Sequence, residues 1–360
     1  MSDKSKQRIS AIDALRGLAV LLMITQHVIY WVCGELHTNP AMPALGAMGG
    51  LAAPIFIVLA GTGATLTAER HKNIDRLLAG RGLMIIGFGY LLNLLTPNWF
   101  SLESWYVLHM IGFGLLTAPV LRRLSSPLLA ILVLVTIALT ALIQSSLNTP
   151  LVMHNQHMAS TTLPGGIFRL ALAESFFPVF PWMAFFIAGL LAGRWLVSKT
   201  ISFLWRSAAL LFAAALLLSG VYMAGFDFAR HASLIRVFKP IPNFYPALMP
   251  ITFLLLSAAL FLLFVFMFFS SFHKPLNPAS NRLQTTPLVC LGRCSLTILI
   301  VHIPLIREPV VRIDIWRTLS VPETLVVTLA VLILFTLAAL WWSRINFRYG
   351  AEWLLRRAFL

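Results

Sequence analysis

The chain has 360 residues, of which 59% are hydrophobic and only 11% charged, and its mean hydropathy is +0.86. A soluble domain is nearer half apolar and a quarter charged, so this composition excludes a soluble globular protein. The formal net charge of +15 comes from 27 lysine and arginine residues against 12 acidic ones. In a membrane protein such an excess reports the orientation of the chain in the bilayer, and we predict no nucleic-acid partner.

Long apolar runs follow one another along the whole chain, separated by short polar segments. A run of about 20 apolar residues is long enough to cross the hydrocarbon core of a bilayer as a helix. We therefore predict an all-α, polytopic membrane protein and treat residues 1–360 as a single integral membrane domain. We predict about ten transmembrane helices. They cover residues 11–34, 45–68, 77–96, 104–121, 127–146, 177–197, 203–225, 249–271, 286–306 and 322–343.

The distribution of basic residues predicts the topology. An even number of crossings places both termini on one side, and most lysine and arginine residues fall in segments on that side. The positive-inside rule then assigns both termini to the cytoplasm. Residues 344–360 are basic, and Glu352 precedes Arg356 by four positions, which predicts an amphipathic cytoplasmic tail lying on the membrane.

The first apolar run carries three ionisable side chains, Asp13, Arg16 and His27. Such groups are costly in a membrane helix and usually face a partner or a wet cavity. A helix would place Arg16 and His27 on one face within about 20° and ~16 Å apart along the axis. This spacing suits an elongated ligand, with Arg16 on a phosphate and His27 exchanging a proton. The alternative is that Arg16 pairs with Asp13 and His27 packs between helices.

Other side chains are candidates for the same chemistry. Basic residues around the second and third runs, including Arg76 and Arg81, form with Arg16 a possible phosphate clamp, although topology alone also explains a basic loop. Asn93 in the third run and Ser295 in the ninth are candidate donors to an oxyanion, or else polar contacts between helices.

The ninth run contains two further candidates, Arg293 and His302. In a continuous helix their nine-residue separation puts them about 180° apart, so they would not share a face. His302 either lines a cavity or is a hydrogen-bonded core histidine. The three cysteines, Cys33, Cys290 and Cys294, lack a metal-binding spacing, and we predict no metal site.

Several segments resemble a known family. ISAIDALRGLAVLLMITQHV resembles the opening helix of the transmembrane acyltransferases, in which Arg or Lys is followed eleven residues later by His. LAAPIFIVLAGTGATL resembles the next helix of heparan-alpha-glucosaminide N-acetyltransferase and its bacterial relatives. YVLHMIGFGLL, FPVFPWMAFFIAGLLAGR and LGRCSLTILIVHIPL are similar to later helices, and RYGAEWLLR is similar to the end of the YeiB-like bacterial branch.

The resemblance implies an acyltransferase that moves an acyl group, usually acetyl from acetyl-CoA, to a hydroxyl or amine of a glycan or other envelope molecule. His27 matches the histidine of the bacterial first helix, whereas the catalytic histidine of the lysosomal enzyme falls in the following loop, where this chain has His37. Both stay candidates for the base. Gln26 stands where the bacterial pattern often has an acid, and His302 matches the histidine of the ninth helix.

The candidate residues thus form two groups. The catalytic candidates are His27, His37, Asn93 and His302, and the candidates for binding acetyl-CoA are Asp13, Arg16, Arg76, Arg81, Arg293 and Ser295. The alternative function is a transporter or flippase that uses Asp13, Arg16 and His27 as coupling residues. The bacterial style of the motifs indicates a bacterial inner membrane, with the lipid bilayer and an envelope glycan as partners, and leaves a homo-oligomer open.

Overall fold

The computed structural model of the chain describes residues 8–36, 38–71, 73–152, 166–226, 228, 231–242, 244–272 and 286–359. It is 76% helical, and the residues described form no strand. The prediction of an all-α protein is confirmed.

The helices follow the predicted apolar runs closely. In the part of the chain that the structure describes, eight helices are long and apolar enough to cross a membrane, and a bent pair adds a ninth if it counts as one span. The shorter apolar helix α5 covers most of the remaining predicted run. The cytoplasmic side of the termini stays a prediction. The elements are α1 (Ser10–Val32), α2 (Ala41–Gly49), α3 (Ala52–Ala68), α4 (Ile74–Leu95), α5 (Val107–Leu121), α6 (Ser126–Ser146), α7 (Gly166–Arg169), η2 (Leu170–Glu174), α8 (Val179–Val197), α9 (Ser202–Met223), α10 (Ala232–Phe238), α11 (Met249–Phe272), α12 (Pro287–Arg293), α13 (Ser295–His302), η4 (Ile303–Arg307), α14 (Glu308–Arg312), α15 (Val321–Ser343) and α16 (Ala351–Arg357).

The chain divides into two compact units, each described by itself. Unit 1 comprises Met1–Phe56 and Val265–Leu360, and unit 2 comprises Ile57–Phe264. The chain leaves unit 1 within α3 and returns to it within α11. The single functional domain expected from the sequence stays a prediction.

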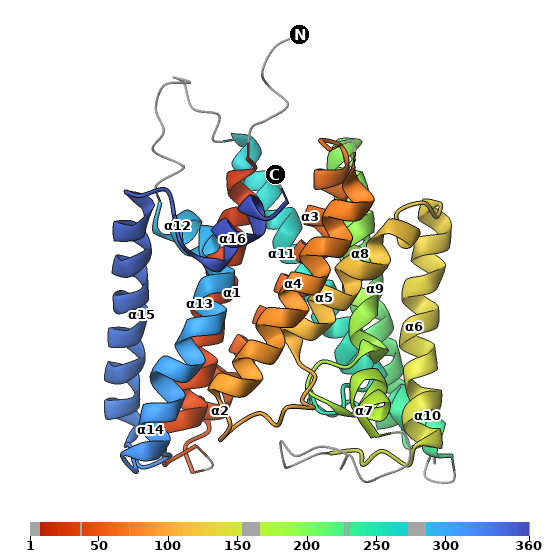
Figure 1. Ribbon diagram of the computed structural model, residues 1–360. Coiled ribbons are helices and arrows are strands. Elements are labelled where there is room, and N and C mark those ends of the chain that lie inside the picture. Colours follow the sequence, from red (N-terminus) through yellow and green to blue (C-terminus); the bar gives the residue numbers. More distant parts are fainter. Residues whose placement is uncertain are drawn as a thin grey trace. The chain divides into compact units, whose positions relative to one another are not determined.

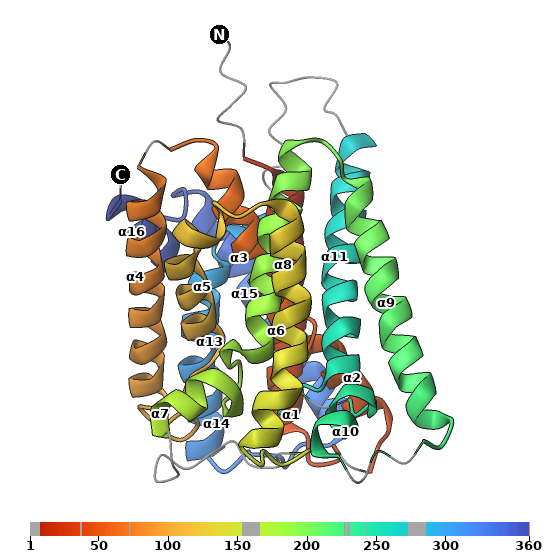
Figure 2. The same cartoon turned by 90° about the vertical axis from the view of Figure 1, so that its right-hand side faces the viewer.

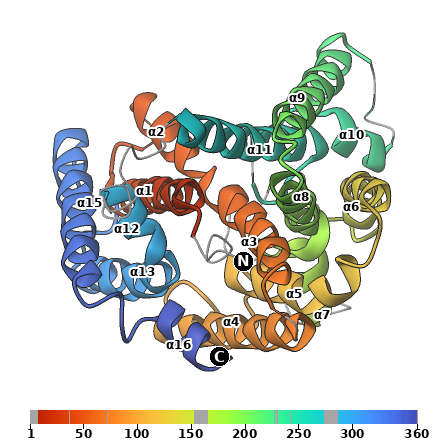
Figure 3. The ribbon, with the colours of Figure 1, turned by 90° about the horizontal axis from the view of Figure 1, so that it is seen from above.

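In unit 1, α1 packs against α2, α12, α13 and α15 (Figures 1 and 3). Its closest neighbour is α12, because glycines stand where the two backbones touch. A Cβ atom on Gly17 would lie 1.9 Å from the backbone oxygen of Leu288, and one on Gly292 would lie 1.7 Å from the backbone oxygen of Asp13. Small residues of this kind allow close helix packing in membranes, so α12 is fixed against the first turns of α1.

The predicted helix 286–306 is broken. Its first part, α12, and the part that begins with α13 differ in direction by 73°. The break falls at Cys294, whose backbone is not helical (φ −117°, ψ 21°). The continuous helix assumed for Arg293 and His302 is therefore absent, and the two residues belong to different helices. The physical reason is tertiary, since α12 follows its contact with α1 while α13 takes another direction.

In unit 2, α4 packs against α5 and α6 packs against α8 (Figure 2). The short helix α10 packs against α6. At one end of the first pair, Asp75 of α4 accepts hydrogen bonds from Arg122 (2.8 Å) and Arg123 (2.6 Å). In the interior, a Cβ atom on Gly61 or Gly189 would lie 2.1 Å from a backbone oxygen of the facing helix, so α3 and α8 are in backbone contact. Glycine at both positions allows this close approach of the two helices.

Candidate functional site

Asp13, Arg16 and His27 all lie on α1, which is helical without interruption from Ser10 to Val32. Asp13 and Arg16 are in its first two turns, and His27 is near its other end. The continuous helix predicted for Arg16 and His27 is therefore confirmed. The two ends of α1 in unit 1 carry two separate groups of polar contacts.

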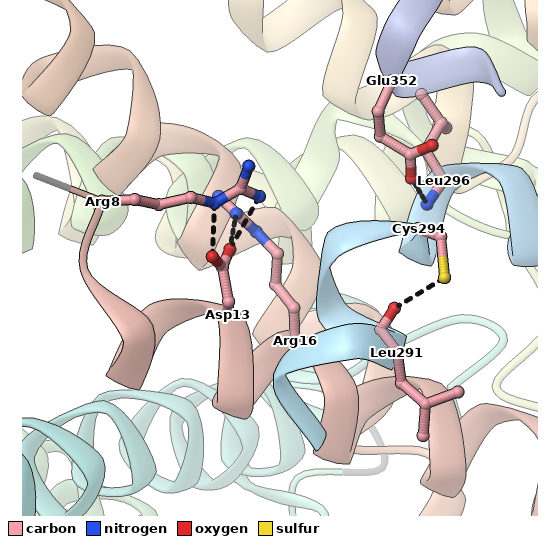
Figure 4. Close-up of polar contacts among 7 residues, drawn as sticks. All are labelled: Arg8, Asp13, Arg16, Leu291, Cys294, Leu296 and Glu352. Carbon is pink, nitrogen blue, oxygen red and sulfur yellow. Dashed lines mark hydrogen bonds and ion pairs between the residues drawn. The ribbon is translucent and has the colours of Figure 1, made fainter. Parts of the chain in front are cut away.

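At the first end, the buried carboxylate of Asp13 is bonded to two arginines (Figure 4). Oδ1 accepts hydrogen bonds from Nη2 of Arg8 and Nη1 of Arg16, each at 3.0 Å, and Oδ2 accepts one from Nε of Arg8. The pairing of Arg16 with Asp13 that the sequence left open is present. A guanidinium has five N–H donors, so this pairing leaves Arg16 with donors for a ligand.

Arg293 adds a third cation to this end of unit 1. It ends α12, directly after Gly292, which touches the backbone of Asp13. Its guanidinium carbon lies 4.6 Å from the ring centre of Phe347, and its buried Nε has no hydrogen-bond partner in the described part of the chain. Arg8 and Arg16 pair with the buried carboxylate of Asp13, and Arg293 follows the glycine that touches the Asp13 backbone. This group of four residues, the Asp13 cluster, holds three cations and one carboxylate.

The Asp13 cluster lies beside the break in the ninth span, where Ser295 begins α13. The buried Ser295 is followed by Leu296 and Thr297, whose backbone N–H groups donate to Oε1 of Glu352 at 2.6 and 3.2 Å. Figure 4 shows the hydrogen bond from Leu296. Sequence reasoning assigned Glu352 a partner on its own helix and missed this contact. The short helix predicted in the tail is present as α16, but its acid faces α13.

At the other end of α1, His27 meets His302. Nδ1 of His27 and Nε2 of His302 are 2.8 Å apart, and the two rings are nearly parallel, with 6° between their planes. Nδ1 of the fully buried His302 lies 2.9 Å from the backbone oxygen of Ile298, one turn earlier in α13. Trp31, one turn after His27, stacks on the His27 ring at 5.0 Å. Sequence reasoning proposed both histidines but gave no reason to pair them.

These contacts assign the proton positions. The oxygen of Ile298 can only accept, so Nδ1 of His302 donates to it. Nε2 of the neutral His302 ring then accepts the hydrogen bond from Nδ1 of His27. In this arrangement Nε2 of His27 carries no proton. An unprotonated Nε2 could take a proton, and His302 would then stabilise the imidazolium so formed.

The remaining candidates lie elsewhere. Arg76 is exposed and Arg81 partly buried on α4 in unit 2. Asn93 is buried on the same helix, and its amide donates to the backbone oxygens of Leu102 (3.2 Å) and Ser104 (2.9 Å), so it holds the loop after α4. Their predicted roles stay predictions. His37 lies outside the described residues.

The described residues contain no group of three or more His, Cys, Asp or Glu side chains that could hold a metal ion. One end of α1 carries the Asp13 cluster, whose cations could bind an anion, and the other end carries the His27–His302 pair, which could transfer a proton. Both belong to unit 1.

The comparison with protein families matches residues 8–220 to the family described as heparan-alpha-glucosaminide N-acetyltransferase, catalytic. The match covers more than half of the chain and includes α1 with Asp13, Arg16 and His27. No curated protein sequence gives a significant match. The family resemblance drawn from the sequence is confirmed, and the match gives no support to the transporter or flippase alternative.

Proposed function

The chain belongs to the heparan-alpha-glucosaminide N-acetyltransferase family, and from this premise we propose that it transfers an acetyl group from acetyl-CoA to a hydroxyl or amine of a glycan or other envelope molecule. The observation that carries the proposal is the hydrogen bond between His27 and His302. Acyl transfer to a weak nucleophile needs a base at the acceptor, and histidine is the side chain best suited to that role near neutral pH.

His27 acts as the base and His302 orients it. As the acceptor oxygen or nitrogen attacks the thioester carbonyl carbon, its proton passes to Nε2 of His27. The tetrahedral intermediate then collapses, the carbon–sulfur bond breaks, and the CoA thiolate takes the proton back from His27. His302 accepts from Nδ1 of His27 throughout, a role that a carboxylate has in many catalytic triads. In this proposal His302 takes the place of the acid that related sequences often have where this chain has Gln26.

The Asp13 cluster is the proposed site for the phosphates of acetyl-CoA. The cluster holds three arginines and a single buried carboxylate, and the buried Nε of Arg293 lacks a hydrogen-bond partner among the described residues. Phosphate oxygens would supply both the negative charge and the missing acceptor, and guanidinium groups bind phosphate in a bidentate manner. The roles of Asp13 and Ser295 follow from this, since Asp13 orients Arg16 and Ser295 starts the helix beside the cluster.

Four predicted candidates keep their proposed roles, three on α4 of unit 2 and one in the sequence after α1. Arg76 and Arg81 remain candidates for the cofactor, and Asn93 for the oxyanion. His37 remains the alternative base. The acceptor is an envelope molecule of a bacterial inner membrane, and the family description makes a glucosamine end group the first candidate.

The proposal is tested with detergent-purified protein and acetyl-CoA. Release of the free CoA thiol is measured with a panel of acceptors, which includes a glucosamine-terminated oligosaccharide and a glycan with hydroxyl groups only. His27→Ala should lower turnover ~10²- to 10⁴-fold, the usual effect of losing a general base, and should leave acetyl-CoA binding intact. Unchanged turnover in His27→Ala together with loss in His37→Ala would move the base to the loop after α1.

A further inference from the structure

The break at Cys294 leaves the start of a helix inside unit 1. The first backbone N–H groups of a helix have no partner within it, and in surroundings that exclude water such groups must be satisfied by other parts of the protein. Cys294 does not cap α13, since its thiol donates to the backbone oxygen of Cys290 at 3.2 Å. The start of α13 therefore needs a cap from elsewhere in the chain.

Glu352 of α16 provides that cap with both carboxylate oxygens. Oε1 accepts from the N–H groups of Leu296 (2.6 Å) and Thr297 (3.2 Å), and Oε2 accepts from the hydroxyl of Thr297 (2.6 Å). The same hydroxyl oxygen accepts from the N–H of Ala351 at 2.9 Å, which links the two helices in the other direction. A carboxylate is also favoured here by the positive end of the helix dipole.

The opposite end of α13 carries the histidine pair. Ile298 and His302 are both in this helix, and His302 is its last residue. Gly17 and Gly292 fix α12 against α1, and the backbone turns by 73° after α12. The direction of α13 is therefore not set by α12, as it would be in a continuous helix. At 1.5 Å per residue, α13 is about 12 Å long. A small change in tilt or rotation at its start therefore moves the His302 ring relative to His27.

We propose that Glu352 is a positioning residue for the histidine pair: by capping α13 it sets the direction of this helix and so keeps Nε2 of His302 within hydrogen-bond distance of His27. The inference rests on the proposed function and adds a residue from the end of the chain to it. Glu352 acts through hydrogen bonds, so its charge is secondary. In this proposal it acts on the acetyl group and the acceptor only through the histidine pair.

The test compares Glu352→Ala with Glu352→Gln. Glutamine keeps the pattern, because its Oε1 can accept from both N–H groups and its Nε2 can donate to the hydroxyl oxygen of Thr297. Glu352→Ala should lower kcat about 10- to 100-fold, the effect expected when a catalytic group is displaced by about 1 Å, with the Kd for acetyl-CoA unchanged. Glu352→Gln should recover most of the lost kcat. Turnover is measured as CoA release with the best acceptor of the panel.

Glu323→Ala is the matched control. Glu323 caps α15 in the same unit, where its Oε2 accepts from the N–H (2.8 Å) and the hydroxyl (2.6 Å) of Ser320. Because α15 carries no candidate site residue, kcat should stay at the wild-type value. If Glu352→Ala does not fold, Thr297→Val replaces it, and we expect a smaller loss of kcat in the same direction.

Three results would overturn the inference: a normal kcat in Glu352→Ala or its substitute, equal losses in the alanine and glutamine variants, or a weaker Kd with kcat unchanged. His27→Ala is assayed in parallel, so that failure of the proposed base is recognised separately. If His27 is not the base, the ¹⁵N spectrum of histidine-labelled protein still tests whether Glu352 positions His302. The His302→Gln variant is used to assign the signal. The Nε2 signal of His302 should change in Glu352→Ala and not in Glu352→Gln, and an unchanged signal would overturn the inference.

Discussion

Asp13 in unit 1 and Glu174 in unit 2 are both buried carboxylates bonded to arginine, and the two differ in what surrounds the arginines. Asp13 in unit 1 and Glu174 in unit 2 have side chains only 2% and 1% exposed. The partners of Asp13 stay accessible, with Arg8 45% and Arg16 26% exposed. Around Glu174, Arg169 is 14% exposed and the neighbouring Arg236 only 4%.

The guanidinium groups of unit 2 bind the backbone. Nη2 of Arg169 donates to the oxygen of Leu147 (2.6 Å), and Nη2 of Arg236 donates to that of Thr149. Burial lowers the pKa of Arg236, whereas the hydrogen bond to Glu174 raises the pKa of Arg169. This network fastens the segment after α6. The count of charges is therefore a poor guide to a binding site, and the better guide is whether the donors end on the backbone or stay accessible to a ligand.

The largest effect is expected from Glu174→Ala. It removes the carboxylate and leaves the cations around it buried without their partner, which should lower the free energy of unfolding by about 3–5 kcal/mol. Chemical denaturation in detergent measures this. Glu69→Ala, an exposed acid in the same unit, is the control and should have little effect. A loss of acetyl-CoA affinity without a loss of stability would reverse the assignment of roles.

Arg293→Ala should mainly affect binding. A hydrogen bond to a charged group contributes about 1.5–3 kcal/mol, so the Kd for acetyl-CoA should rise roughly 10- to 100-fold, as measured by calorimetry. Arg293→Lys should recover only part, because lysine lacks the planar guanidinium. Arg206→Ala removes an exposed arginine that packs on aromatic rings in unit 2 and should leave the Kd unchanged. Normal affinity in Arg293→Ala would remove this residue from the proposed phosphate site.

Arg16→Ala should weaken acetyl-CoA binding roughly tenfold, since one charge-assisted hydrogen bond is lost. Stability should change little, because Arg8 still donates twice to Asp13. If Arg16 is only structural, Arg16→Ala lowers the melting temperature with normal affinity, and Asp13→Asn combined with Arg16→Ala restores it. The melting temperature and Kd of the two single variants and the double variant distinguish the cases.

The smallest effect is expected from salt, which should act differently on the arginines around Asp13 and those around Glu174. Accessible charges are screened over about 8–10 Å at physiological ionic strength, and buried ones much less. Raising the potassium chloride concentration should therefore weaken acetyl-CoA binding in the wild type. The stability difference between wild type and Glu174→Ala should hardly change. If salt changed the acetyl-CoA affinity and this stability difference equally, the contrast between accessible arginines at Asp13 and buried ones at Glu174 would be contradicted.

The fold followed from the sequence because its elements are fixed by local properties. A helix that crosses lipid must satisfy its own backbone groups and be apolar over its length, so hydropathy alone locates it. The predicted runs 127–146 and 322–343 accordingly agree with α6 and α15 to within a residue at each end. Arg16 and His27 share a single continuous helix for the same reason.

The break at Cys294 and the partners of the site residues were decided by the tertiary structure alone. His27 and His302 are 275 positions apart, and Glu352 is 56 positions from the N–H it caps. No local pattern selects such pairs, because they depend on which helices pack together and in which direction. The sequence thus determined which segments cross the membrane and which side chains are chemically able to act. Packing of α12 and α13 against α1 determined which of them meet, since a hydrogen bond requires a distance and an angle that only the assembled helices provide.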